Sequence, residues 1–222
     1  MKSGSSFSRR FRGTVDIDAN ASITMNAGAE FTTDGGNLRI SATGAVSDIT
    51  LGDVGVASGS VAIVAGRSIL DADTLAGTPL ANDSDRDITA SSVRLTAAGS
   101  AGVQGASANA IETEAVTLAA SAGSGGINLI DDTALTIGSV SSVVVNRVTS
   151  AGGVSAEPAT AEAALAGLST TASSNGSIVA RATALTVSNA VGANGSGNVL
   201  LQAQSGAMAV NAGVSSGSGH IS

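Results

Sequence analysis

The chain has 222 residues, of which 43% are apolar and only 1% aromatic, with 29 glycines and no cysteine. A core built from these residues must use small and β-branched side chains, which suit thin, closely stacked layers. The absence of cysteine excludes disulfides, thiol catalysis and Cys-ligated zinc. The net charge of −7 argues against nucleic acid and anionic membranes as partners, and no apolar stretch approaches the roughly 20 residues that span a bilayer.

Residues 1–12 carry the one basic run, formed by Lys2 and the "RRFR" stretch, and are predicted to be a linker or tag-like segment. Residues 13–222 are predicted to form a single domain and to be a fragment of a longer repeat array. The first thirty residues lack the apolar segment of a secretory signal, so any export signal is expected to lie outside this chain.

One sequence phrase recurs along the chain: a turn residue, then apolar–x–apolar–x–Ala. It occurs at 13–19, 36–42, 59–65, 91–97, 114–120, 176–182 and 197–203, with a degenerate copy at 141–147. The first apolar residues of these copies are Val15, Leu38, Val61, Val93, Val116, Val143, Ile178 and Val199. The commonest spacing between them is roughly 23 residues, within the range of solenoid repeats. Ile221 falls where a ninth copy would begin.

Within each phrase the apolar residues alternate with other residues, which is typical of a strand with one buried face. The first two apolar positions are therefore predicted to point inward, and so is the alanine at 19, 42, 65, 97, 120, 182 and 203; Arg147 interrupts this column. Asp16, Arg39, Ala62, Arg94 and Thr117 are predicted to point outward. Weaker strands, such as "DITLGD" and "AMAVNA", fill the rest of each repeat.

This pattern predicts an all-β parallel β-helix, or β-solenoid, of about eight to nine coils with roughly 23 residues each. Coils would stack about 4.8 Å apart, so that Asp16 and Arg39 become neighbours on adjacent coils. The handedness of parallel crossovers favours a right-handed coil. An antiparallel β-sandwich is the main alternative, although it would not explain the recurring phrase.

Two insertions interrupt the repeat, at about 71–87 and 150–173. The first is polar and rich in turn residues. The second is predicted to contain a short helix, with Ser155 as its cap, Pro158 in its first turn and Gly167 at its end. Insertions project from a solenoid, so they are the expected places for specialised contacts.

Residues that could carry chemistry are few. His220 is the only histidine and is expected on an outward strand position, so no catalytic triad can be built on it. The carboxylate pairs Asp16/Asp18, Glu112/Glu114 and Asp131/Asp132 are interpreted as solvated faces rather than as glycosidase-type acids. Asp83, Asp85 and Asp87 resemble the start of a calcium loop, but Ile88 and Arg94 replace its Gly and Glu. The sequence therefore predicts no catalytic, cofactor-binding or metal site and no cofactor.

The stretches "GNLRISATGAVSDITLGDV", "GSVAIVAGRSILDAD" and "GNVLLQAQSGAMAVNAG" resemble the coils of filamentous-haemagglutinin-like giant bacterial surface proteins. The resemblance covers nearly all of residues 13–222 and is specific for the architecture. It implies an exported rod, extracellular or on the bacterial cell surface, in an adhesin or matrix component. It supplies no catalytic residues.

The predicted function is thus a non-catalytic structural rod segment of a surface adhesin or filament. Its expected partners are neighbouring repeats or further copies stacked end to end, with no nucleic acid and no membrane insertion, and any host-cell or polysaccharide ligand is left open. One alternative is a sheath or fibre subunit that polymerises end to end. Another is a carbohydrate-active β-helix enzyme, which would need three or more charged side chains converging on one outer face.

Overall fold

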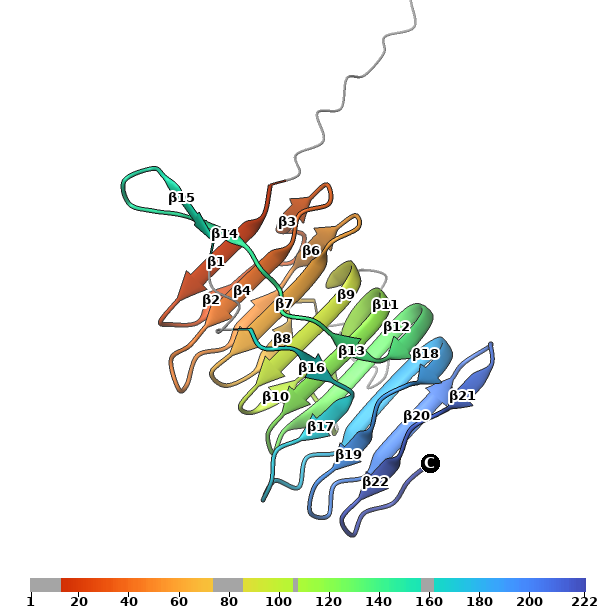
Figure 1. The fold of residues 1–222 in the computed structure, drawn as a ribbon. Helices are drawn as coiled ribbons and strands as arrows, with labels where there is room; N and C mark the ends of the chain where they lie inside the picture. The colour runs from red at the N-terminus through yellow and green to blue at the C-terminus, as the bar shows by residue number, and fades with distance from the viewer. Residues whose placement is uncertain (1–12, 74–85, 106–107, 157–161) are drawn as a thin grey trace, which may run out of the picture.

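The structure is a computed structural model that describes residues 13–73, 86–105, 108–156 and 162–222. These residues form an all-β protein of 22 strands, without a helix among them (Figure 1). The strands are β1 (Val15–Ala19), β2 (Ile23–Thr24), β3 (Glu30–Thr33), β4 (Leu38–Ala42), β5 (Ile49–Leu51), β6 (Asp53–Val56), β7 (Ser60–Ala65), β8 (Ile69–Asp71), β9 (Ile88–Ala97), β10 (Ser100–Ala101), β11 (Ile111–Ala122), β12 (Gly126–Ile137), β13 (Ser139–Val140), β14 (Asn146–Val148), β15 (Val154–Ala156), β16 (Leu165–Ala166), β17 (Leu168–Thr170), β18 (Ile178–Val187), β19 (Val191–Ala193), β20 (Val199–Ala203), β21 (Met208–Val210) and β22 (Val214–Ser216).

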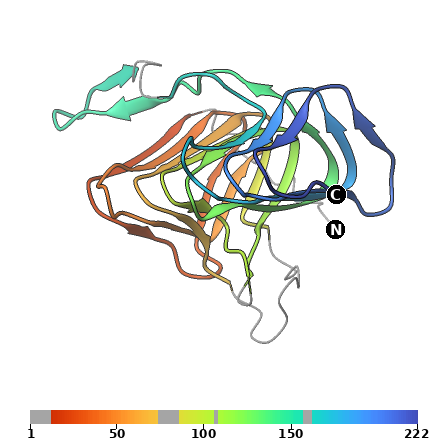
Figure 2. The same cartoon turned by 90° about the horizontal axis from the view of Figure 1, so that it is seen from below.

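Eighteen of these strands join in one sheet whose paired strands run parallel, and the sheet curves round until it nearly closes (Figure 2). The arrangement is solenoid-like, since the chain passes repeatedly around the same core. Two antiparallel pairs, β13–β16 and β14–β15, lie outside this sheet. The parallel pairing shows that the alternative of an antiparallel β-sandwich is wrong.

Two long rows of paired residues line the interior. The first row consists of Ile17, Ile40, Ile63, Leu95, Ala120, Leu168, Val191 and Val214. The second row consists of Ile23, Ile49, Ile69, Ala101, Ile127, Ile178, Val199 and Ile221. The chain visits the two rows alternately, and the inner members of both rows are buried in one continuous aliphatic core.

The predicted register is confirmed at the N-terminal end. Val15 pairs with Leu38, Leu38 with Val61, and Val61 with Val93, and the alanines at 19, 42, 65 and 97 pair in the same way. Ile178, Val199 and Ile221 also pair with one another, but they belong to the second row. The recurring phrase therefore forms strands in both rows, because a strand of either row needs only apolar residues at every second position.

The prediction for Val116 is wrong. In β11 it is Leu118 that pairs with Val93, and Ala120 pairs with Leu95. The phrase is therefore displaced by two positions at this pass, and Val116 is 65% exposed. A pass that is two residues longer keeps the in–out alternation, which is why the sequence pattern concealed the displacement.

The degenerate phrase at 141–147, unlike the others, lies outside the large sheet. The chain leaves the sheet at Gly138 and returns at Gly167, whose N–H donates to the Gly138 carbonyl at 2.8 Å. We call residues 138–167 the arm. Figure 1 shows the arm, in blue-green, running along the outside of the sheet from β12 back to β1. Val143 and Val145 of the arm pack against Ala62, an outward residue of β7.

The insertions differ from their predicted form. The second excursion spans the arm rather than 150–173, and the helix predicted from Ser155 to Gly167 is wrong for the described residues, which form β15 and β16. Pairing of β15 with β14 overrides the local helical pattern. Residues 157–161, including Pro158, lie outside the described part of the chain, and so do residues 74–85 of the first insertion.

Candidate functional site

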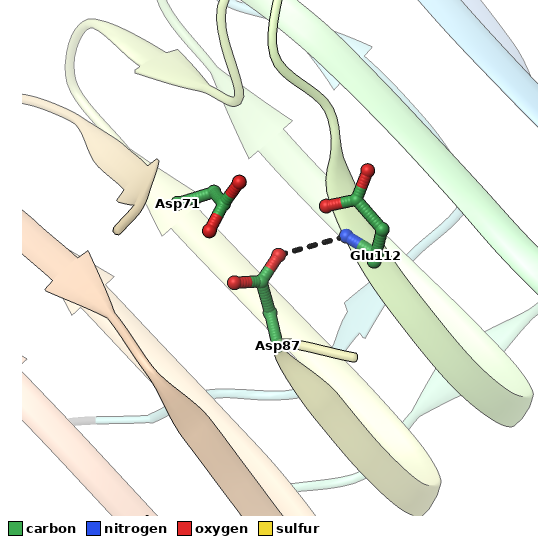
Figure 3. A group of neighbouring side chains, drawn as sticks. All are labelled: Asp71, Asp87 and Glu112. Atoms are coloured by element: carbon green, nitrogen blue, oxygen red, sulfur yellow. Dashed lines mark hydrogen bonds between the residues drawn. The ribbon is translucent and has the colours of Figure 1, made fainter. Parts of the chain in front are cut away.

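Three carboxylates meet on neighbouring passes of the chain. Asp71 ends β8, Asp87 immediately precedes β9, and Glu112 lies near the start of β11 (Figure 3). Each offers a carboxylate oxygen, and these oxygens lie within 4.8 Å of one another. Asp87 and Glu112 are buried and Asp71 is half-buried. We call these three residues the acidic cluster, the group of three potential metal ligands that the described residues bring together.

Hydrogen bonds to the backbone hold the acidic cluster in place. The Glu112 N–H donates to Asp87 Oδ2 at 2.8 Å, as the dashed line in Figure 3 marks. Asp71 accepts from the Asp73 N–H at 2.8 Å and from Asn109 Nδ2 at 2.9 Å. Two of the three carboxylates therefore satisfy N–H groups at the ends of strands, which is a structural use of an acid.

Burial raises the pKa of Asp87 well above its ordinary value, and the nearby carboxylates of Asp71 and Glu112 raise it further. The hydrogen bond from the Glu112 N–H acts in the opposite direction. The acidic cluster therefore binds a proton more readily than an isolated aspartate does. Asp71, Asp87 and Glu112 are also the residues that could bind a hard cation, since such cations prefer carboxylate oxygens.

The sequence pattern placed Asp87 with Asp83 and Asp85, as in the start of a calcium loop. Asp83 and Asp85 lie outside the described residues. The sequence nevertheless contained a signal for the acidic cluster. Asp71 and Asp87 flank the first insertion, whose two ends must lie close together if the coil continues, and Glu112 follows Asp87 by the length of one pass.

The three predicted carboxylate pairs do not converge on one site. Glu112 belongs to the acidic cluster, whereas Glu114 forms an ion pair with Arg86 at 2.7 Å. Arg86 also contacts Asp132 at 3.3 Å. Asp131 and Asp132 are consecutive in β12 and point to opposite sides of the strand. Glu112 and Glu114 lie two residues apart in β11 but differ in burial and in their contacts.

Asp131 is fully buried and serves the backbone. It accepts hydrogen bonds from the Ala115 N–H at 2.9 Å, from the Thr133 N–H at 2.8 Å and from the Thr113 hydroxyl at 2.7 Å. These donors surround the place where the pairing of β11 with β12 shifts by one residue. At this irregular bend, Asp131 therefore accepts hydrogen bonds from groups that regular strand pairing would otherwise satisfy.

The predicted proximity of Asp16 and Arg39 is confirmed, at 2.8 Å from Asp16 Oδ1 to Arg39 Nη1. The same Asp16 contacts Arg147 of the arm at 2.7 Å, and Asp18 contacts it at 3.1 Å. These acids are thus paired with arginines. The predicted outward direction holds for Arg39, Ala62 and Arg94, but the arm covers all three, and they are buried.

A buried charge network fastens the arm. Glu162 contacts Arg39 Nε at 3.0 Å and Arg94 Nη1 at 2.7 Å, and all three side chains are buried. Burial alone would lower the pKa of Arg39, but its hydrogen bonds to Asp16 and Glu162 raise it above its ordinary value. The network stabilises the docked position of the arm.

His220 lies in an exposed position where its carbonyl accepts from the Val199 N–H at 2.8 Å. A Ser-His-Asp site built on His220 would need an acid beside the imidazole. The acidic cluster lies elsewhere in the described residues, at the end of β8, just before β9 and near the start of β11, whereas His220 lies beside β20.

The protein is therefore of the all-β class with a mostly parallel, solenoid-like sheet. Comparison of the chain with protein-family models, with curated proteins and with solved structures finds no match. In the described residues, the structure has no helix of the length and apolar character needed to cross a membrane.

Proposed function

We propose that the sheet is a right-handed parallel β-helix of about eight coils and that the chain acts as a non-catalytic structural segment of a longer filament. The observation that carries this proposal is the pair of eight-member rows, whose inner residues are continuously buried. A core that extends in one direction lengthens the molecule with every coil, which is the property of a rod.

The arm supports the same function. It contacts β1 through Arg147, β4 through Glu162 and β9 through the same Glu162. A single segment therefore spans four consecutive strands, β1, β4, β7 and β9, on one side of the stack. Each coil otherwise contacts only its neighbours. A lateral brace of this kind resists bending and separation of coils, as a load-carrying segment requires.

The acidic cluster favours a structural role over the alternative of a carbohydrate-active enzyme. Three carboxylates do meet there, as an enzyme would need, but Asp87 and Asp71 hold backbone and side-chain N–H groups. A general acid must reach the bond that it protonates, and Asp87 is only 5% exposed.

The test of the catalytic alternative is incubation with a panel of neutral and acidic polysaccharides, followed by measurement of new reducing ends. We expect no cleavage by the wild type. Cleavage that disappears in Asp87→Asn, with the fold retained, would overturn the non-catalytic proposal and assign the acidic cluster as an active site.

The coil arrangement has its own test, made clean by the absence of native cysteine. Thr24 pairs with Thr50, and Thr50 with Leu70, on three successive strands. Oxidation should close a disulfide in Thr24→Cys/Thr50→Cys, since paired strands bring Cα atoms within the roughly 4.4–6.8 Å that a disulfide needs. The control Thr24→Cys/Leu70→Cys, two strands apart, should not close. The reverse result would contradict the parallel stacking.

An extracellular or cell-surface location completes the proposal. It rests on the resemblance of the repeats to filamentous-haemagglutinin-like proteins and on the cysteine-free, aromatic-poor composition, which suits export as an unfolded chain. Antibodies against the chain should label intact, unpermeabilised cells of the organism that encodes it. Labelling only after permeabilisation would contradict the location and leave the β-helix proposal intact.

End-to-end association is a second candidate, favoured by exposed apolar residues near the C-terminal edge of the sheet. Met208 is 43% exposed, Val210 52% and Ile221 51%, and the opposite end of the sheet has the half-buried Ile17 and Phe31. Light scattering over a concentration series should show mass increasing in the wild type and less so in Val210→Lys. A monomer at every concentration would exclude this candidate.

A further inference from the structure

A groove crosses the outer side of the sheet over β12, β18 and β20, on the opposite side of these strands from the second row. It has a volume of about 380 Å³. Three outward residues in one register, Asn128, Val179 and Leu200, run across it, and Arg181 and Gln202 form the next register. The parallel ladder thus places an apolar strip beside a polar one. The groove is separate from the acidic cluster, none of whose members lines it.

Arg181 is the only charged residue among the described residues that line the groove. It is 8% exposed, and its Nε has no hydrogen-bond partner. It forms no ion pair within 4.0 Å in the described part of the chain, in contrast to the equally buried Arg39 and Arg94, which both contact Glu162. A guanidinium removed from water without a close counter-charge is costly, so it is a strong recognition group for an anion.

Asn128 supplies a second unsatisfied group. It is 3% exposed, and its Nδ2 donates to the Val103 carbonyl at 2.7 Å, which fixes the orientation of the amide. Its Oδ1 has no hydrogen-bond partner. The free end of Asn128 is therefore an acceptor that requires a donor such as a hydroxyl.

The electrostatics of the groove agree with this geometry. Burial lowers the pKa of Arg181 from its ordinary value, and the Glu112 carboxylate acts in the opposite direction. Glu112 is two strands away through Ile130, so its charge acts on Arg181 without forming a direct pair. A carboxylate bound in the groove would provide the closer partner that Arg181 lacks.

We infer that this groove binds a uronate, a sugar unit that carries both a carboxylate and hydroxyl groups. The carboxylate pairs with Arg181, a hydroxyl donates to Asn128 Oδ1 after a small side-chain adjustment, and the apolar face of the ring lies on Val179 and Leu200. A neutral hexose offers the same ring and hydroxyls but leaves the guanidinium unpaired. Selectivity for the acidic sugar over its neutral counterpart is therefore the signature of the site.

The test is a calorimetric titration of the full chain with glucuronate and galacturonate, with glucose as the neutral probe. We expect saturable binding of at least one uronate and at least about tenfold weaker binding of glucose, because a charge-assisted hydrogen bond is lost. If neither uronate binds at concentrations up to about 10 mM, any affinity is weaker than that of a weak specific site, and the inference is wrong. Equal binding of glucose would overturn it as well.

Variants then assign the site. Arg181→Gln should weaken uronate binding about tenfold or more. Leu200→Glu, a second variant at a half-buried position that leaves Arg181 in place, should do the same by repelling the carboxylate. Arg67→Gln removes an exposed arginine outside the groove and should bind as the wild type does. Unchanged affinity in both groove variants would place the ligand elsewhere and contradict the inference. Neither result depends on whether the chain is a rod.

Discussion

Arg39 and Glu162 are 123 residues apart in the sequence, yet Arg39 Nε lies 3.0 Å from Glu162 Oε1 in the buried interface between the sheet and the arm. Glu162 also binds Arg94, at 2.7 Å. One carboxylate therefore joins β4, β9 and the arm. The arm covers outward residues that would otherwise be solvated, and this changes an ordinary outer face into a second interface.

The first prediction concerns this carboxylate. Glu162→Gln keeps the shape of the side chain but removes its charge, leaving Arg39 with Asp16 and Arg94 without a charged partner in a buried place. We expect the free energy of unfolding to fall by about 3–5 kcal/mol, the usual cost of breaking a buried pair. Urea denaturation measures it. Asp48→Asn, which removes an exposed ion pair with Arg67, is the control and should change little. Equal effects of the two variants would contradict the role of the network.

The second prediction separates the two registers of β11. Leu118 is fully buried and Val116 is 65% exposed. Leu118→Asp should destabilise the protein by several kcal/mol, because it buries an unpaired charge and removes core packing. Val116→Asp in the same strand should change the stability by no more than about 0.5 kcal/mol. If thermal unfolding ranks the two variants in the opposite order, the register predicted from the repeat would be right and the displaced register wrong.

The third prediction is a pH dependence from Asp87, whose pKa is raised in the folded protein. Between the unfolded value of about 3.9 and the raised value, the folded state binds more protons than the unfolded state. The free energy of unfolding therefore falls as the pH rises through this window, and the loss persists above it.

Asp87→Asn removes that titration and retains an acceptor for the Glu112 N–H. The variant should gain stability relative to the wild type as the pH is raised from about 4 to 8. Melting temperatures of both proteins across this range measure the difference. A stability difference that does not vary with pH would show that the pKa of Asp87 is not raised in the folded protein.

The fourth prediction concerns glycine at the corners between passes. A Cβ on Gly123 would lie 1.8 Å from the Ala98 carbonyl oxygen, and Gly176 and Gly197 meet the carbonyls of Gly123 and Gly176 in the same way, at 2.4 and 2.1 Å. Gly123→Ala should therefore destabilise the protein by about 1–3 kcal/mol. Gly213→Ala meets nothing within 4 Å and should be neutral or slightly stabilising. Similar losses in both would mean that the corners are not closely stacked.

Much of the sheet could be predicted because its information is local. A period of two marks the buried face of a strand, and the repeat spacing placed Asp16 beside Arg39 and Val15 beside Leu38. The same spacing failed at Val116 and at Val143. A two-residue extension preserves the alternation, and the arm uses the same valine pattern to cover Ala62 from outside.

The candidate sites were harder to predict. The acidic cluster combines residues from three passes of the chain, and the groove combines outward residues of three strands with one unpaired arginine. Outward positions follow no hydrophobic pattern. Their neighbours depend on the lengths of the intervening loops, which local sequence does not specify.

The sequence by itself determined the all-β class, the parallel repeat and the inward residues of the first four passes, because alternation and spacing are properties of consecutive residues. Only the tertiary structure decided that the repeats divide between two rows, that the arm returns along the outside to place Glu162 between Arg39 and Arg94, and that Arg181 remains without a close counter-charge. These relationships join residues tens to more than a hundred positions apart, and the packing of the whole sheet fixes them.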